Sequence, residues 1–178
     1  MIDTRYLTDV FDSLMPYIRE NYDTVNQEEP YYMYGTIKNI TKQLKEKDKG
    51  EFKYKKYPLI LLIQPFSEDH GTNSSISYTA SPRVSILTPS EYNYNSPERY
   101  TNTYKTILYP IYKLLLKSIE RSNYIYTIGG VNKIDHEKID QLNYGDDQRI
   151  SNIFNSFLDG LDFQFNNLNV LPNLYACQ

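Results

Sequence analysis

The sequence has few of the residues from which catalytic and metal centres are usually built. Its 178 residues include one cysteine, two histidines and no tryptophan. The single cysteine, Cys177, excludes an intramolecular disulfide and a zinc site made of several cysteines. So little cysteine is typical of a protein made in a reducing compartment, and we therefore expect synthesis in the cytosol.

Motifs for chemistry are also missing. The sequence contains no HExxH or CxxC metal motif, no GxSxG nucleophile motif and no GxxxxGK[ST] or GxGxxG phosphate-binding loop. The two histidines, His70 and His136, have acidic neighbours, but such surroundings are far more often solvated surface than metal sites. The sequence therefore predicts no cofactor, no metal, no catalytic residue and no enzymatic activity.

Long hydrophobic runs are absent as well. No window approaches the roughly 20 apolar residues that a membrane helix requires, and the N-terminus lacks the basic start and apolar stretch of a signal peptide. We therefore expect a soluble chain without a membrane partner. The most apolar stretch, YPLILLIQPF from Tyr57 to Phe66, is much shorter.

This stretch and two later ones predict the strands of a sheet. The first is bounded by Pro58 and Pro65, as expected for a central strand buried on both faces. Tyr78 to Leu87 resumes strand character, and Pro82 within it indicates a strand start or an edge. Leu161 to Val170 alternates between apolar and polar residues at its start, which predicts a half-buried strand that completes the sheet.

Two segments predict helices. Residues 3–20 carry apolar residues at three- and four-residue spacing, with Asp3 or Thr4 as the cap and a kink or early end at Pro16. The second helix begins at Ser96-Pro97-Glu98, which combines a capping residue, a first-turn proline and a first-turn acid. It is expected to run to about residue 122, with a bend at Pro110.

The remaining segments are polar, and we predict a charged loop over residues 41–56 and a polar loop over residues 129–149. The fold class that follows is α+β, with a small mixed or antiparallel sheet packed by an N-terminal helix and a long central helix, in a single domain spanning residues 1–178. The predicted core consists of Leu59, Ile60, Leu61, Leu62, Ile63, Val84, Ile86, Ile107, Leu108, Ile111, Leu115, Phe163 and Phe165.

Charge is distributed unevenly along the chain. Lys38 to Lys56 holds eight lysines against three acidic residues, whereas Asp135 to Asp162 holds seven acidic residues against two basic ones. Such runs are most often solvated surface. The alternative is a pair of complementary faces that dock head to tail between copies of the chain. The candidate interface residues are Lys45, Lys47, Lys49, Asp69, His70, Asp135, Glu137, Asp140, Asp146 and Asp147.

A second functional interpretation also rests on the lysine-rich segment. Phe52, Tyr54 and Tyr57 lie among or directly after its lysines, and aromatic rings with lysines suit a single-stranded nucleic acid. The alternative function is thus a small nucleic-acid-binding accessory protein. The net charge of −3 and the scarcity of arginine in the segment favour a solvated surface instead.

The order of the segments resembles the tail-terminator and neck-ring proteins of tailed bacteriophages. The N-terminal helix is followed by the Tyr-Pro strand opening at Tyr57-Pro58, and then by a strand at residues 83–87. A helix that begins at Ser96-Pro97 and continues through residues 107–112 comes next. The ending is similar too, with residues 136–145, residues 152–159 and a closing strand from Leu161 to Val170. In outline the resemblance covers residues 1–171.

The resemblance implies a mechanical function in the virion. Copies would form a homo-oligomeric ring, hexameric or dodecameric, at the head-to-tail junction. The partners would be neighbouring connector, portal or tail proteins, and DNA would pass through the channel without specific binding. The resemblance also implies a helix over one face of the central strand, with a second layer, such as a neighbouring subunit, over the other.

Overall fold

The computed structural model describes residues 6–23, 28–48, 57–70, 77–91, 93–126, 135–144 and 158–171. The predicted α+β class is confirmed, because helices pack on a mixed sheet. In chain order the elements are α1 (Leu7–Asn21), β1 (Tyr31–Gly35), α2 (Ile37–Asp48), β2 (Leu59–Asp69), β3 (Tyr78–Pro89), α3 (Ser96–Arg99), η1 (Tyr100–Leu108), α4 (Tyr109–Arg121), β4 (Ile125–Tyr126), β5 (His136–Tyr144), β6 (Leu158–Phe165) and β7 (Leu168–Val170).

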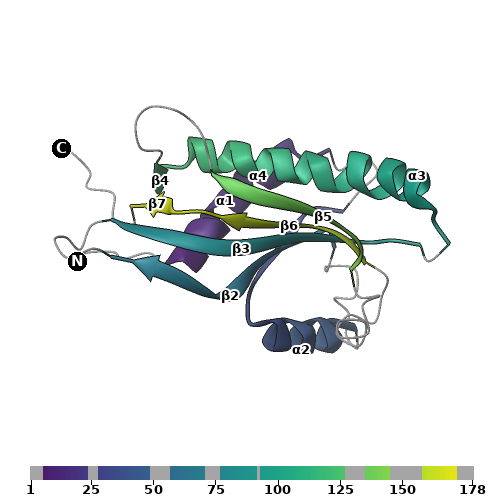
Figure 1. Ribbon diagram of the computed structural model, residues 1–178, viewed down its shortest axis with the longest axis horizontal. Coiled ribbons are helices and arrows are strands. Elements are labelled where there is room, and N and C mark those ends of the chain that lie inside the picture. Colours follow the sequence, from purple (N-terminus) through teal and green to yellow (C-terminus); the bar gives the residue numbers. More distant parts are fainter. Residues whose placement is uncertain are drawn as a thin grey trace.

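The sheet has the strand order β1-β2-β3-β6-β5, which places β1 and β5 at its two edges. Figure 1 shows β2, β3, β6 and β5 in this order. β1 runs parallel to β2, and the other neighbours along this path are antiparallel. β7 continues alongside the first residues of β3 and also pairs with the short strand β4. The last long strand of the chain, β6, therefore lies inside the sheet rather than at its margin.

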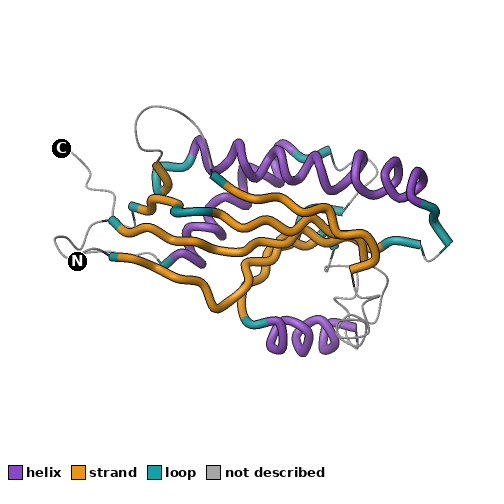
Figure 2. The backbone as a smooth tube through the Cα atoms, viewed as in Figure 1, coloured by secondary structure: helices purple, strands orange, loops and turns teal. Residues whose placement is uncertain are grey.

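Both faces of the sheet are covered by helices of the same chain, as the two helical layers in Figure 2 illustrate. Ile60 and Leu62 of β2 belong to a core cluster with α1 and α4. Leu59, Leu61 and Ile63, on the opposite side of the strand, belong to a second cluster with α2. The continuous apolar run of β2 is thus explained, because each alternate set of side chains has its own helical cover.

The second cover, α2, corrects the prediction of a charged loop. Residues 41–48 are the C-terminal part of a helix, and residues 49–56 lie outside the described ranges. The Thr36 hydroxyl accepts a hydrogen bond from the Asn39 amide at 3.3 Å, which satisfies one of the helix's first donors. Ile40 and Leu44, four residues apart, are buried against the sheet, while lysines cover the exposed side.

The N-terminal helix starts later and ends later than predicted. α1 begins at Leu7 after the cap residue Tyr6, whose amide donates to the Asp9 carboxylate at 3.2 Å. The predicted caps, Asp3 and Thr4, lie outside the described residues. Pro16 does not end the helix, which continues to Asn21 because its apolar stripe is buried in the larger core cluster.

The long central helix is continuous from Ser96 to Arg121, close to its predicted end. Its cap is Asn95 rather than Ser96, because the Asn95 side chain accepts from the Glu98 amide at 3.0 Å and the Asn95 amide donates to the Glu98 carboxylate at 2.8 Å. Pro110 does not break the helix either. The nine residues before α4 adopt a π-helix, η1, in which the chain shifts register ahead of the proline that lacks an amide donor.

Two irregularities shape the strands around β3. The pairing of β2 with β3 changes register between Ile63 and Ser67, where Pro65 of β2 and Pro82 of β3 cannot donate hydrogen bonds. Pro82 thus lies inside a central strand at a bulge, neither at a strand start nor at a sheet edge as predicted. The predicted closing strand is likewise divided at Asn167, whose φ of 55° is left-handed, into β6 and β7.

The polar loop predicted over residues 129–149 is also partly wrong. His136–Tyr144 forms the edge strand β5, which pairs with β6 from His136 opposite Phe165 to Tyr144 opposite Leu158. Residues 127–134 and 145–150 lie outside the described ranges. The strand has no apolar alternation because the side chains that face the long helix are polar. They are His136, Lys138 and Asp140, and they contact tyrosines of that helix.

The predicted core is almost entirely confirmed. Every one of its thirteen residues is buried except Ile107, which is partly buried and packs on the edge of the larger cluster. β6 is buried on both faces rather than half-buried, because even its acidic residues Asp159 and Asp162 have partners and little exposure.

Candidate functional site

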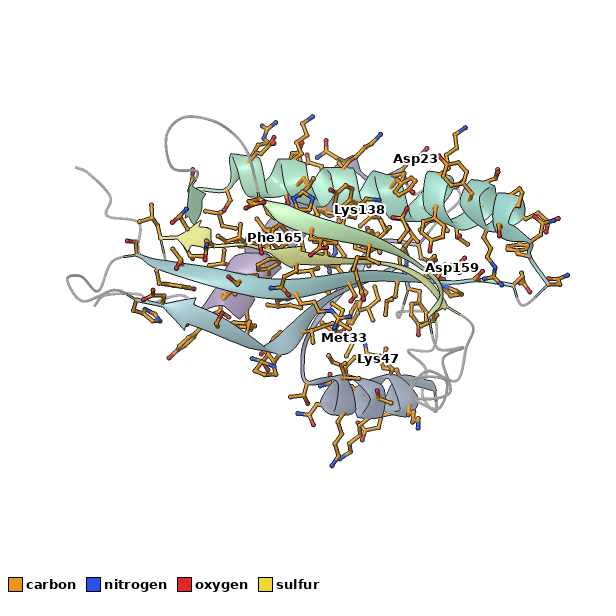
Figure 3. The ribbon with its side chains drawn as sticks, viewed as in Figure 1. Asp23, Met33, Lys47, Lys138, Asp159 and Phe165 are labelled. Carbon is orange, nitrogen blue, oxygen red and sulfur yellow. The ribbon has the colours of Figure 1, made fainter. Side chains whose placement is uncertain are left out.

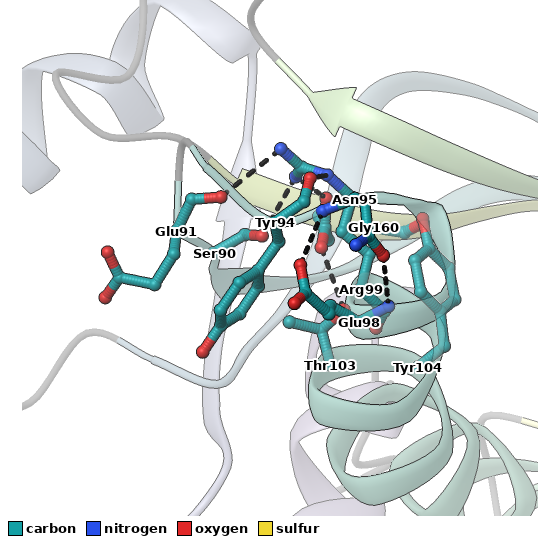
Figure 4. A network of polar contacts seen from close by, with 10 residues as sticks. Ser90, Glu91, Tyr94, Asn95, Glu98, Arg99, Thr103, Tyr104 and Gly160 are labelled. Atoms are coloured by element: carbon teal, nitrogen blue, oxygen red, sulfur yellow. Dashed lines mark hydrogen bonds and ion pairs between the residues drawn. The ribbon is translucent and has the colours of Figure 1, made fainter.

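The most deeply buried ion pair of the described residues joins the long helix to β6 (Figure 4). The Arg99 guanidinium lies 2.9 Å from the Asp159 carboxylate, and the two side chains are 6% and 0% exposed. The same Arg99 nitrogen, Nη1, also donates to Ser90 Oγ at 2.9 Å, and Nε and Nη2 donate to the carbonyls of Tyr94 and Glu91 at 3.1 and 3.3 Å. One side chain therefore ties the end of β3 and the following connection to the start of β6.

The remaining members of this network complete its hydrogen bonds. The Thr103 hydroxyl lies 2.8 Å from the second carboxylate oxygen of Asp159, and the Tyr104 hydroxyl donates to the Gly160 carbonyl at 3.2 Å. Burial, followed by the nearby Asp159 carboxylate, raises the pKa of Tyr104. A fully buried carboxylate with partners on both oxygens acts as a structural anchor that sets the distance between helix and sheet.

The second acid of the Asp159–Asp162 pair has a different environment. Three residues apart on a strand, the two side chains point to opposite faces of the sheet. Asp162 lies on the face that carries α2, where it accepts from Arg83 at 2.6 Å and from the Ser85 hydroxyl. The two carboxylates therefore do not act together, and each is neutralised by its own arginine.

At the β5 edge, the inward side chains pack under the long helix. The Tyr109 hydroxyl donates to the Asp140 carboxylate at 2.8 Å, and the Lys138 ammonium lies 2.5 Å from that carboxylate and 5.0 Å from the Tyr109 ring. Burial, together with the Asp140 carboxylate, raises the pKa of Tyr109 to about 12. Figure 3 shows Lys138 near the long helix.

The other face of β5 is exposed and partly apolar. Ile139 lies opposite Asp162 in the sheet and is 54% exposed, and Glu137 beside it is also exposed. Asp135, directly before the strand, is exposed as well. We call this surface, made of Asp135, Glu137 and Ile139, the β5 edge surface. An isoleucine flanked by two acids gives it an apolar centre with a negative rim.

The opposite edge of the sheet is formed by β1 and α2. Ile37 is 38% exposed at the start of α2, and Lys38, Lys42 and Lys45 are exposed on the same helix. Tyr34, 51% exposed, lies on the opposite face of β1, in one row with Leu62. We call these five residues the β1–α2 edge surface. Residues 37–48 hold four lysines against two acids, whereas residues 135–144 hold three acids against one lysine. The two edges of one sheet thus carry opposite charge, each with exposed apolar residues.

The structure brings some of the predicted interface residues to these edges and leaves others elsewhere. Lys45 is exposed on α2, Lys47 lies with its ammonium 3.5 Å from the Tyr31 ring centroid, and Asp135, Glu137 and Asp140 belong to the β5 edge. Asp69 and His70 belong to neither edge surface; they lie at the end of β2, where the His70 ring packs on the Tyr78 ring with centroids 4.8 Å apart. Lys49, Asp146 and Asp147 lie outside the described residues.

Sequence reasoning missed the exposed apolar residues of both edges. Tyr34, Ile37 and Ile139 were not among the predicted interface residues, although each lies next to a charged run in the sequence. The signal that could have found Ile139 is its isolation, because a lone β-branched residue within a polar strand has no core partner on its side.

The described residues also form a pocket, but they contain neither a cluster of metal-ligating side chains nor a helix that could span a membrane. An open pocket of about 820 Å³ lies between the end of α1 and the long helix, lined by residues that include Tyr22, Tyr100, Lys105 and Lys113. Within the described ranges, no three His, Cys, Asp or Glu side chains come together as metal ligands. No helix in these ranges is both long and apolar enough to span a bilayer.

Comparison of the chain with models of protein families gives no match, and neither does comparison with curated proteins. The assignment of a function therefore depends on the fold, on the two edge surfaces and on the segment order described above.

Proposed function

We propose that the chain is a structural protein that forms a closed homo-oligomeric ring at the head-to-tail junction of a tailed bacteriophage. The observation that carries the proposal is the placement of two complementary surfaces at opposite edges of the same sheet. One is positive, with Lys38, Lys42 and Lys45, and the other is negative, with Asp135 and Glu137.

Complementary patches on different sides of one subunit join copies head to tail. Such a contact is heterologous, and it produces a ring whenever the rotation between neighbours closes. The charges would select the correct pairing and reject like-charged contacts between two identical edges. The exposed Tyr34, Ile37 and Ile139 would supply the apolar area that surface charge pairs alone do not provide.

The location in the virion rests on the segment order that resembles tail-terminator and neck-ring proteins. A hexameric or dodecameric ring would surround the DNA channel and contact portal, connector or tail proteins above and below. The net charge of −3 is compatible with a channel that DNA passes without binding. In this proposal the chain has no catalytic step, and the buried Arg99–Asp159 pair keeps the subunit rigid under load.

Charge reversal at the two edges tests the ring. We expect Lys38→Glu/Lys45→Glu to abolish self-assembly of the full chain in sedimentation velocity, and Asp135→Lys/Glu137→Lys to do the same, because each leaves like charges facing each other. The decisive sample is an equimolar mixture of the two variants. In the mixture, the negative β1–α2 edge of one variant can face the positive β5 edge of the other, and the two unchanged edges can also face each other. Both contacts are complementary, so assembly should return.

The matched control is Lys113→Glu/Lys117→Glu, which changes charge equally on the exposed side of α4 and should leave assembly intact. A wild-type chain that stays monomeric at every concentration, or a mixture that fails to assemble, would count against the head-to-tail contact. The alternative nucleic-acid function makes a separate prediction, which is salt-dependent binding of a single-stranded oligonucleotide that the Lys38→Glu/Lys45→Glu variant loses.

A further inference from the structure

The backbone of both edge strands has hydrogen-bonding groups directed away from the sheet. The Tyr31 amide donates to the Pro58 carbonyl at 2.8 Å, so Tyr31 faces β2 and its neighbours Tyr32 and Tyr34 direct their amide and carbonyl groups outward. The Asp135 carbonyl accepts from the Asn166 amide at 2.9 Å, so Asp135 faces β6, and the backbone amide and carbonyl groups of Lys138 and Asp140 are directed away from the sheet edge. Their side chains remain on the face covered by the long helix.

These outward groups match each other in direction and position. β1 and β2 run in the same direction, and each of the next three neighbours along the sheet, β3, β6 and β5, reverses the direction of the strand before it. β5 therefore runs antiparallel to β1. The recorded registers align Tyr34 with Leu62, Val84, Phe163 and Lys138 in one row across the sheet. A copy rotated about an axis along the strands would therefore bring its β1 beside β5 as an antiparallel neighbour.

We propose that the occupant of the β5 edge is strand β1 of a second copy of this chain, so that the sheet continues from subunit to subunit by an antiparallel ladder. The inference rests on the proposed ring and specifies the contact that closes it. Lys138 of one copy pairs with Tyr34 of the next, and Asp140 with Tyr32, and these are the residues whose backbone groups point outward on both strands.

The side chains on the α2 face of the sheet fit the same arrangement. Glu137 and Ile139 of β5 lie on the face that carries α2, because Ile139 shares a row with Asp162, Ser85 and Leu61 of that face. In the continued sheet they would meet Met33 and α2 of the next copy, where Ile37 and Lys38 are exposed. The exposed apolar residue thus meets apolar residues, and the acids meet lysines. An edge strand otherwise left open is a liability that natural proteins avoid.

A disulfide ladder tests this pairing. In a Cys177→Ser background, we expect Tyr34→Cys/Lys138→Cys to give dimers, trimers and higher rungs on mild oxidation in denaturing gels, up to the size of the closed ring. Opposed residues of an antiparallel ladder have Cα atoms about 5.5 Å apart, within disulfide reach. The same two positions within one chain are four strand spacings apart, about 19 Å, so no intrachain bridge can form.

The matched control is Tyr34→Cys/Glu137→Cys, in which Glu137 lies one residue from Lys138 and is also exposed, but on the opposite face of the strand. It should give no ladder, because a strand places successive side chains on opposite faces. Closing the ring can shift the register by two residues, so Tyr34→Cys/Asp140→Cys, on the same face as Lys138→Cys, is tested alongside.

The outcomes separate the inference from the proposed function. A ladder from a same-face pair and none from Glu137→Cys supports strand addition. No ladder from either same-face pair, or equal ladders from both faces, overturns it, even where charge reversal and remixing still establish a head-to-tail ring joined by side chains alone. A chain that neither cross-links nor assembles overturns the inference and the self-assembly on which it rests.

Discussion

Replacing Arg99 by methionine is expected to lower the free energy of unfolding by about 3–5 kcal/mol, because it leaves the Asp159 carboxylate buried without its partner. The same change removes the donors to Ser90, Glu91 and Tyr94, which hold the connection after β3. Urea unfolding followed by circular dichroism measures the loss. A domain with a total stability of about 5–15 kcal/mol would lose a large share of it.

Arg83→Met is the matched control, because Arg83 also pairs with an aspartate of β6 but is 48% exposed. Its loss should be clearly smaller, since solvent screens the pair and Asp162 keeps the Ser85 hydroxyl. The double variant Arg99→Met/Asp159→Leu should recover part of the loss of Arg99→Met, because no unpaired charge remains. Equal losses for the two arginines would show that the Arg99 pair is not a buried anchor.

Leu44→Ala should destabilise the protein by about 2–5 kcal/mol, the range found for buried leucines, although the surrounding sequence is strongly charged. Leu44 is 4% exposed and belongs to the cluster that α2 forms with Leu59, Leu61 and Ile63. The measurement is again the urea midpoint at an unchanged slope.

Lys42→Ala serves as the control for Leu44→Ala, since Lys42 is exposed two residues away and its ion pair with Glu46, at 4.0 Å, is loose and exposed. Its effect should stay within about 0.5 kcal/mol. Small and similar effects at both positions would mean that the segment behaves as a solvated loop and does not cover the sheet.

The central strand and the long helix could be predicted from sequence because their signals are local and redundant. Leu59 to Ile63 is a continuous apolar run, and the long helix begins with a proline and an acid in its first turn. The same local reasoning failed for α2, whose contribution to the core is only Ile40 and Leu44 among many lysines. A small buried face on a charged helix is visible only when the surface that it covers is known.

Strand β5 was missed for a related reason. Its inward side chains are polar, and they are stabilised by tyrosines from a helix more than twenty residues earlier, such as Tyr109 on Asp140. No periodicity in the strand itself can reveal such partners. The candidate site was therefore only half predicted: the charge asymmetry was read from composition, but its separation onto two edges depends on strand order, which the sequence does not give locally.

The central claim is that the chain is a stoichiometric ring component of a phage particle. The direct measurement is quantitative mass spectrometry of purified particles that carry this gene, with copies counted against the portal protein. We expect a ratio of one-half or one, corresponding to a hexameric or dodecameric ring on a dodecameric portal. Absence of the chain from purified particles would contradict the claim, whatever the chain does in solution.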